Sequence, residues 1–583
     1  MIETDNGVYY MTAGETCYVI AANGGTLGNV YFGKRVERED DISTLGGDRT
    51  VFPEFALTYT RGGKSARTEF APVGAEILEE KPLFDAPTLC GGKTLAVTVQ
   101  DKAAGLRAEL YYTPYPRGGF SRRAVVYNES KKTVTIGCAS VFSAFGTYDV
   151  LTVEKSGAVE RKTCGGVYNG DGLSNFTALL EHNADDERGS AYGFVFPYGD
   201  GALRASVDKQ SAYAEACLGD GIVVAAGASV RLPETLAVYS DRGACGMTRV
   251  FHDILRENMG DKTISERRPT VLFCPALEKK QLLAAVSLAA EIGFDVFATD
   301  GGAVSADTLS AVAEECKQSG IRAGLSVLPS AIARSSAVYC DACVPDKTGK
   351  SSGIDLSRSD AVQVFSDALC STIAKNGISY LMIDLPRGGS YPFAAGMYAL
   401  RKILADSFPD LVTEWGAVPP EMRYAQSLCY PPCVMRNTVD ATANCSFKTR
   451  FDCATFGCLG YALDPNALSD DAKRAVRAQI LSYQDDASAV IRGDLYRPKA
   501  AKGDRCRMAV TKDKSKAYAV YERNGSDYVR IKLVGLDERN IYHIRELGKT
   551  FSGAALVNYG VAVPSRADGD TFVLHLRQVA DYE

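Results

Sequence analysis

The chain has 583 residues, 46% of them hydrophobic and 23% charged, with a net charge of −6. This length exceeds what one hydrophobic core can organise, so we expect about three or four domains. The acidic balance and the absence of a basic stripe exclude nucleic acid and anionic membrane as expected partners. No window has the apolar length of a membrane span and the first residues lack a secretory signal, so we expect a cytoplasmic protein.

Residues 1–245 predict a large antiparallel β-sandwich. Short alternating runs such as "TLAVTVQD" and "LRAELYYTPY" are separated by Gly, Asn and Asp turns, and this period of two at this spacing is typical of sandwiches. The following stretch "ACGMTRVFHDILRENMGD" (244–261) has the periodicity of an amphipathic helix. We therefore place a helical linker at 246–267.

Residues 268–500 change to alternating strands and helices. The run "TVLFCPA" precedes the helical "LEKKQLLAAVSLAAEIG", and four further strand-like runs follow with helices between them. Such alternation predicts a parallel sheet, and the length suits one (β/α)8 TIM-type barrel. A doubly wound sheet is the alternative, but no GxGxxG or Walker loop follows the first strand. Residues 501–583 return to alternating runs and predict a small antiparallel β domain or sandwich.

The cysteines and histidines suggest no cofactor chemistry. The chain has 17 cysteines in mostly apolar surroundings, which indicates packed thiols in a reducing compartment. "CDAC" (Cys340 and Cys343) is a single CxxC without a second pair or a nearby histidine. The four histidines have no neighbour that would complete a triad or a metal site. We expect no metal ion and no organic cofactor.

Acidic residues stand at the ends of the expected barrel strands, where barrel enzymes keep their catalytic groups. The four acids are Asp300 after "VFAT", Asp384 after "YLMI", Glu414 after "LVT" and Asp440 after "VMRNTV".

The architecture and several strings resemble glycoside hydrolase family 36, the α-galactosidase or melibiase family. These strings are "AVYSDRGACGMTRVFHDILREN", "TRFDCATFGCLGYALDPNALSDDAKRAVRAQILSYQ" and "YHIRELGKTFSG", in the family's order. The resemblance implies an N-terminal β-supersandwich, a central barrel and a C-terminal antiparallel β domain. It also implies a retaining mechanism with two carboxyl groups, one a nucleophile and one an acid/base.

The family's nucleophile motif, K-W-D-M-N-R, corresponds here to "MIDLPR". The resemblance places Asp384 at the nucleophile and Arg387 at the closing arginine, which is expected to bind substrate. Met382 stands in place of the lysine that binds sugar hydroxyls, and Pro386 in place of the asparagine.

The family's acid/base motif, S-D-N-T-D-A, corresponds to "RNTVDA". One register places the acid/base at Asn437 and another at Arg436, so neither supplies a carboxylic acid. Asp440 is a candidate substitute acid, although a structural role is the simpler interpretation. Glu414 and Glu421 are further candidates.

Substrate-binding positions are implied at Asp300, Glu414, Trp415 and Arg423. Asp300 lies in "ATDGGA", where the family has L-D-D-G-W-F, so Gly302 replaces a tryptophan. Arg423 is the arginine retained from the family's glycine loop, and Trp415 is the single tryptophan of the chain.

Two functions follow from these patterns. The first is a retaining α-galactosidase-like hydrolase that acts on an α-galactoside or related α-glycoside, with an altered acid/base. The second is a catalytically impaired relative that binds carbohydrate or serves as a scaffold, since several polar groups of the motifs are replaced. The resemblance further implies a carbohydrate ligand and a possible homo-oligomer.

Overall fold

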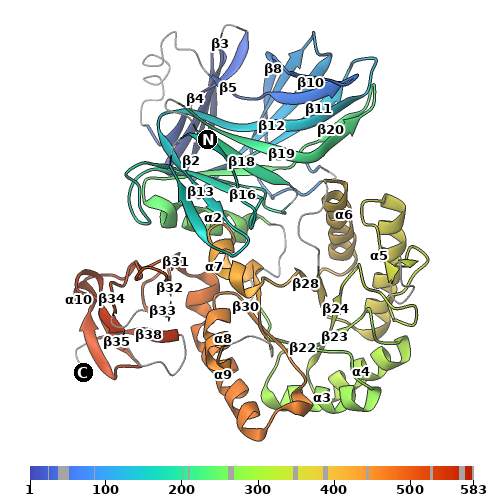
Figure 1. The fold of residues 1–583 in the computed structure, drawn as a ribbon, viewed down its shortest axis with the longest axis vertical. Coiled ribbons are helices and arrows are strands. Elements are labelled where there is room, and N and C mark those ends of the chain that lie inside the picture. Colours follow the sequence, from blue (N-terminus) through green and yellow to red (C-terminus); the bar gives the residue numbers. More distant parts are fainter. Residues whose placement is uncertain are drawn as a thin grey trace.

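The protein forms three parts that follow one another along the chain (Figure 1). The computed structural model describes residues 1–23, 25–36, 52–84, 86–163, 165–199, 201–207, 211–259, 268–345, 352–384, 391–440, 445–524, 529–563 and 571–580. A β-rich N-terminal part, blue to green in Figure 1, lies above a ring of parallel strands and helices. A small C-terminal sheet, drawn in red, lies beside the ring.

The N-terminal part contains three antiparallel sheets. The first has the order β1 (Ile2–Asp5), β2 (Val8–Ala13), β3 (Thr16–Asn23), β4 (Thr26–Lys34) and β5 (Phe52–Pro53). The second has the order β14 (Val159–Lys162), β13 (Tyr148–Val153), β16 (Phe176–Glu181), β17 (Ala191–Val195), β21 (Thr235–Ser240), β11 (Gly119–Asn128), β10 (Leu106–Tyr115), β9 (Thr94–Asp101) and β8 (Ala71–Leu78), with β20 (Ser229–Arg231) beside β11. The third has the order β15 (Gly166–Asn169), β18 (Ala202–Val207), β19 (Ser211–Val224), β12 (Val134–Phe145), β6 (Leu57–Arg61) and β7 (Lys64–Arg67).

The alternating pattern of the sequence explains this sandwich. In β10, Leu106, Ala108 and Leu110 are fully buried, whereas Arg107 and Glu109 between them are partly exposed. Because successive strand residues point to opposite faces, the apolar set lies on the face that meets the other sheets. The predicted N-terminal β-sandwich is confirmed.

Helix α2 (Gly243–Asn258) connects the sandwich to the ring. Its apolar face, which includes Met247, Phe251 and Ile254, lies in one core with strands of the sandwich. Val418 and Met422, which belong to the ring, pack in the same core. Helix α2 covers the first part of the linker predicted at 246–267, whose residues 260–267 lie outside the described ranges, and it joins two parts through a shared hydrophobic core.

The ring contains seven parallel strands in the described part of the chain, one fewer than the predicted eight. Their order is β28 (Val412–Trp415), β27 (Tyr380–Ile383), β24 (Arg322–Val327), β23 (Val296–Asp300), β22 (Val271–Cys274), β30 (Cys458–Ala462) and β29 (Arg436–Asp440). The two outer strands also meet, because Ala417 forms a parallel bridge with Arg436 and the Val418 amide donates to the Arg436 carbonyl at 2.8 Å. This contact closes the ring.

Helices surround the ring, as the sequence predicted. They are α3 (Lys279–Ile292), α4 (Ala306–Gln318), α5 (Ser359–Asn376), α6 (Tyr391–Ser407), α8 (Phe447–Ala454) and α9 (Asp470–Arg492). Shorter elements lie in the connections, namely β25 (Val344–Pro345), β26 (Ser352–Gly353), α7 (Arg423–Gln426) and the 3-10 turns η2 (Pro420–Met422), η3 (Pro432–Val434) and η4 (Pro465–Ala467).

The C-terminal sheet begins at Asp494, a few residues before the boundary predicted at 501. Its order is β31 (Asp494–Tyr496), β32 (Arg505–Val510), β33 (Lys516–Glu522), β38 (Thr571–Val579), β35 (Ile541–Ile544) and β36 (Lys549–Ser552), with β34 (Val529–Ile531) and β37 (Val561–Val563) as a separate pair and α10 (Gly553–Asn558) between them. Since β31 has only three residues, its sequence carries no alternating signal.

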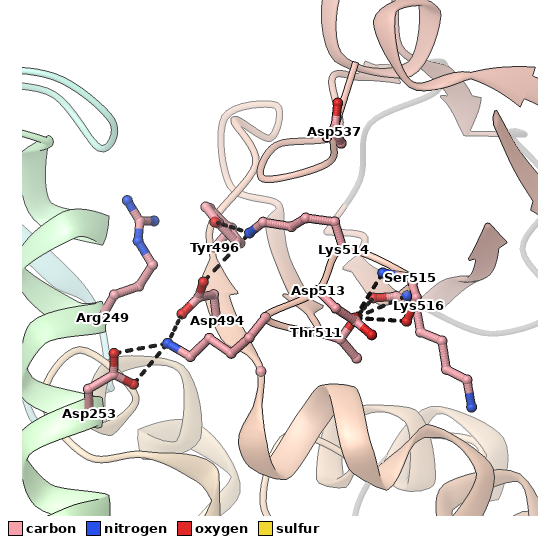
Figure 2. Close-up of polar contacts among 12 residues, drawn as sticks. Arg249, Asp253, Asp494, Tyr496, Thr511, Asp513, Lys514, Ser515, Lys516 and Asp537 are labelled. Carbon is pink, nitrogen blue, oxygen red and sulfur yellow. Dashed lines mark hydrogen bonds and ion pairs between the residues drawn. The ribbon is translucent and has the colours of Figure 1, made fainter. Parts of the chain in front are cut away.

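A polar network, which includes Asp253 and Asp494, attaches the C-terminal sheet to α2 (Figure 2). The Lys512 ammonium lies 2.9 Å from Asp253 Oδ2 on α2 and 2.6 Å from Asp494 Oδ1 on β31. Lys514 Nζ lies 3.6 Å from the other oxygen of Asp494. One carboxylate from α2 and one from β31 are thus held by the hairpin between β32 and β33.

Candidate functional site

Strand alternation decides which side chains enter the interior of the ring. A small apolar cluster fills it, made of Val271, Val296, Ala298, Tyr380, Met382 and Val412, with Phe273 against it. The alternate residues of the same strands pack in the larger core with the surrounding helices, among them Leu272, Phe297, Leu325, Leu381 and Ile383. Each strand therefore has an inner and an outer face that can be followed to its carboxyl end.

Asp384 follows β27 directly and continues the inner face of that strand. Tyr380 and Met382 point inward, so alternation places Asp384 on the same side. Its amide donates to the Val327 carbonyl at 2.8 Å, which extends the pairing of β27 with β24. The side chain is half-buried. This position is the carboxyl end of a barrel strand, as the sequence predicted.

Asp440 is the last residue of β29 and lies on its inner face. Arg436 points inward from the same strand, and four residues of alternation return Asp440 to that face. Its side chain is 33% exposed, and Arg450 Nη1 from α8 lies 4.0 Å from its Oδ1. The Arg450 guanidinium also donates to the main-chain carbonyl of Asp440. Arg450 is a residue that sequence reasoning missed, although it lies in the "TRF" string.

Asp300 ends β23 and is held in a local turn. Its Oδ1 accepts a hydrogen bond from the Gly302 amide at 2.9 Å, and burial raises the pKa of its carboxyl. A β-carbon at Gly302 would lie 2.8 Å from the Ala331 carbonyl oxygen, so this turn has no room for the tryptophan of the family motif. Both the turn role and the binding role considered for Asp300 are compatible with this geometry.

The three acids share one edge of the ring. In the strand order, β24 lies between the strands of Asp300 and Asp384, and β28 lies between those of Asp384 and Asp440. Because all these strands are parallel, their carboxyl ends meet at the same edge. Asp384 is therefore flanked on each side, at a distance of two strands, by another carboxylate.

Asn437 lies on the outer face of β29, away from this edge. It is fully buried, and its Nδ2 donates to the Ala454 carbonyl of α8 at 3.1 Å. Its Oδ1 is also buried and has no hydrogen-bond partner within the described ranges. The acid/base position implied for Asn437 would require an inward side chain, so the geometry argues against that assignment.

Glu414 is engaged in a buried ion-pair cluster in the amino-terminal half of the ring, together with Arg436, Arg268 and Tyr380. Arg436 donates to both carboxylate oxygens at 2.6 Å, the Tyr380 hydroxyl donates at 2.6 Å, and Arg268 Nη2 lies 3.2 Å away. Burial alone would raise the pKa of Glu414, but the two guanidiniums hold it below its ordinary value. Glu414 and Arg436 therefore stabilise the core and do not reach the carboxyl edge.

Three further residues were implied in substrate binding, namely Arg423, Trp415 and Arg387, and they do not share one environment. Arg423 is buried and donates to the Thr438 carbonyl of β29 at 2.6 Å, and burial lowers its pKa to about 10. Trp415 packs with the helix-side core of the ring. Arg387 lies within residues 385–390, outside the described part of the chain. Arg423 thus supports the strand that carries Asp440.

The cysteines are reduced wherever the structure describes them. In the CxxC pair, Cys340 and Cys343 have their sulfur atoms 3.9 Å apart. Within the described ranges, no group of three or more His, Cys, Asp or Glu side chains is arranged to hold a metal ion. The helices in those ranges are too short or too polar to cross a lipid bilayer.

Known proteins are similar to this chain in sequence and in fold. The family model described as "Glycosyl hydrolase family 36 C-terminal domain" matches residues 504–576. Alpha-galactosidase AgaA of Geobacillus stearothermophilus is 25% identical, over 96% of each chain. The galactosidase domain of AgaSK superimposes with a TM-score of 0.85 at 19% identity, covering 99% of this chain and 100% of that one. A crystal structure of an AgaA variant in complex with raffinose gives 0.82 at 21% identity, covering 98% and 100%.

The similarity thus reaches from the sandwich through the ring to the C-terminal sheet. In sequence and in fold the chain is therefore similar to the alpha-galactosidases of glycoside hydrolase family 36.

Proposed function

We propose that the protein is a retaining α-galactosidase-type glycoside hydrolase, with Asp384 as nucleophile and Asp440 as acid/base. One observation carries this proposal. The two aspartates occupy inner-face positions at the carboxyl ends of β27 and β29, with only β28 between them. Asp440 would thereby supply the carboxylic acid that is missing at Asn437, the position implied by the family motif.

The spacing of the strands suits the reaction. Retaining hydrolysis needs two carboxyl groups about 5–5.5 Å apart. Neighbouring strands lie about 4.8 Å apart, so strands separated by one other are roughly 10 Å apart. Because both side chains point into the ring, their carboxyl groups lie closer together than the two strands do, which brings them toward the separation of about 5–5.5 Å that the mechanism needs.

The chemistry then proceeds in two displacements. Asp384 attacks the anomeric carbon and forms a covalent glycosyl ester, while Asp440 donates a proton to the departing glycosidic oxygen. In the second step Asp440 removes a proton from water, which attacks the same carbon and releases the sugar and the Asp384 carboxylate. Both functional groups come from the protein, so this reaction calls for no metal ion or organic cofactor.

Two arginines hold the acid/base strand. Arg450 binds the main-chain carbonyl of Asp440 and places a positive charge near its carboxylate. Arg423 binds the Thr438 carbonyl two residues earlier on the same strand. We infer that these contacts fix the direction of the Asp440 side chain, because a catalytic carboxylate displaced by about 1 Å loses much of its effect.

The substrate class follows from the relatives. AgaA is named an alpha-galactosidase, and a variant of it has been solved with raffinose bound. An α-linked galactoside is therefore the substrate that we propose, with Asp300 and Arg387 as contacts to its hydroxyl groups.

A second candidate, carbohydrate binding without turnover, is favoured by Met382. This side chain packs in the apolar interior cluster, 7% exposed, where the family motif has a lysine. A thioether is at best a weak hydrogen-bond acceptor and cannot replace an ammonium donor. Each hydrogen bond lost to a sugar hydroxyl weakens binding by about 0.5–1.5 kcal/mol, more where a charge is involved.

Covalent trapping separates the two candidates. The protein is incubated with an activated 2-deoxy-2-fluoro galactoside, and intact and peptide masses are measured. A retaining hydrolase gains one fluorogalactosyl group on the peptide that contains Asp384, and Asp384→Ala gains none. Galactoside binding seen by calorimetry without any adduct would establish the second candidate instead.

A further inference from the structure

A cavity of about 290 Å³ lies between the last helix of the ring and the C-terminal sheet. It is separate from the carboxyl edge that carries Asp384 and Asp440, since its walls are α9, β33, β35 and β38 with their ends. The lining residues are Asp485, Asp486, Ala489, Lys516, Ala517, His543, Arg545, His575, Leu576 and Arg577. Its volume is just below the range of about 300–1,000 Å³ that is usual for small-molecule sites.

Most charges around this cavity are already paired. His575 is held between two carboxylates, with Nε2 2.9 Å from Asp486 Oδ2 and Nδ1 2.6 Å from Glu546 Oε1. Arg577 is paired with Asp485, and Arg545 Nε donates to Glu546 at 3.1 Å. Burial alone would lower the pKa of His575, but its two carboxylate partners raise it above the ordinary value. The two carboxylates thus favour the protonated form of His575, although Arg545 Nη2 also lies 2.7 Å from its Nδ1.

Lys516 lines the cavity and takes part in none of these ion pairs. In the cavity lining, Lys516, Arg545 and Arg577 are cations, and Asp485 and Asp486 are carboxylates. Glu546, beside the lining, binds His575 and Arg545. Within the described ranges the Lys516 ammonium has no ion-pair or hydrogen-bond partner. Figure 2 shows this side chain extending away from the turn of Thr511, Asp513 and Ser515. The cavity therefore has, at the long side chain of Lys516, a positive charge that no carboxylate of the described ranges pairs.

We propose that this cavity is a binding site for a small anion that carries a phosphate or carboxylate group, with Lys516 as its principal contact. An anion would neutralise the Lys516 charge and accept hydrogen bonds from ammonium and guanidinium groups. The apolar part of the wall consists of Ala489, Ala517 and Leu576, without a Trp, Tyr or Phe ring. A neutral, partly apolar ligand prefers a wall that is mainly apolar and aromatic, so a second sugar site fits this cavity less well than an anion site.

Calorimetric titration of the full-length protein tests the site, with inorganic phosphate and, separately, acetate as probes in a low-salt zwitterionic buffer. We expect saturable binding that weakens as sodium chloride is added. Lys516→Gln removes the charge with little change in shape and should weaken binding about tenfold. Lys516→Arg should retain binding, and Lys532→Gln, which changes an exposed lysine of the same part of the chain, should leave it unchanged.

The two probes identify the group that the site prefers. Stronger binding of phosphate than of acetate points to a phosphorylated ligand, and the reverse points to a carboxylate; either result supports the site. Circular dichroism and the thermal midpoint show that each variant is folded. Absence of saturable binding of both anions, or equal binding by Lys516→Gln and the wild-type protein, would overturn the proposal.

Discussion

The ring holds acidic residues at two levels, and their surroundings differ. In its amino-terminal half, Glu414 accepts hydrogen bonds from Arg436 and Tyr380 and has Arg268 nearby. At the carboxyl edge, Asp440 has one guanidinium 4.0 Å away and remains partly exposed. A carboxylate whose oxygens are already fully hydrogen-bonded stabilises the core, whereas one that water can reach is able to exchange protons with a substrate. The same residue class thus has two roles within one ring, decided by burial and partners.

The largest effect on activity is expected at Asp384, at the carboxyl edge of the ring. Replacing Asp384 by Ala removes the nucleophile, so we expect hydrolysis of aryl α-galactosides to fall by on the order of 10⁴-fold or more. Steady-state kinetics measures the loss. Asp410→Ala, which removes an exposed acid before β28 at the other edge, should keep full activity. If Asp384→Ala retains most of the activity, the nucleophile lies elsewhere.

The next largest effect is expected at Asp440. Loss of a general acid typically costs about 10²–10⁴-fold, and the cost depends on how much help the leaving group needs. We expect Asp440→Ala to be severely slowed on raffinose-like substrates and much less on dinitrophenyl galactosides, with azide restoring turnover of the latter. An equal loss on both substrate types would contradict the acid/base role.

Replacing Glu414 should lower the stability of the protein more than its activity. Glu414→Gln keeps the shape but leaves the buried Arg436 and Arg268 without their counter-charge, so we expect a loss of about 3–5 kcal/mol in the free energy of unfolding. Urea denaturation measures this loss. The pKa of Glu414 is lowered by folding, so its contribution is complete above the unfolded pKa and disappears as pH falls through the folded one. The stability of the variant should therefore depend less on pH in acid than that of the wild-type protein.

Asn437, on the other face of β29, tests which residue of this strand stands at the acid/base position. Asn437→Asp would place a carboxylate against the Ala454 carbonyl in a fully buried position. We expect it to lower the free energy of unfolding by about 3 kcal/mol and to leave the hydrolysis of poor leaving groups no faster. Asn437→Ala, which introduces no charge, separates the effect of volume from that of charge. A gain in activity for Asn437→Asp would instead support the assignment implied by the family motif.

Much of the fold could be predicted from the sequence, because the signals are strong where elements have one buried face. The alternating residues of β10 and the apolar face of α2 are examples. The place of Asp384 at the end of a strand could be predicted as well, since it follows a short apolar run. The direction of Asn437 could not, because a parallel strand buried on both faces shows no alternation that separates inside from outside. In β29 the inner face even carries Arg436, whose partner Glu414 is distant in the sequence.

The ion-pair cluster was beyond sequence reasoning for the same reason. Arg268, Tyr380, Glu414 and Arg436 come from four separate segments, and only the order of the strands brings them together. Substrate binding was therefore predicted for Glu414, a glutamate near a strand end, whereas the structure places its carboxylate among buried arginine and tyrosine partners.

The core around α2 has a consequence for how the molecule unfolds. Met247 and Phe251 of the helix pack in one cluster with Val418 and Met422 of the ring and with strands of the sandwich. Neither of these two parts can open without exposing apolar surface of the other, so their losses of structure are thermodynamically coupled. A fragment cut between them would be aggregation-prone on both sides of the cut, and the sandwich is better regarded as half of a single cooperative unit than as a detachable module.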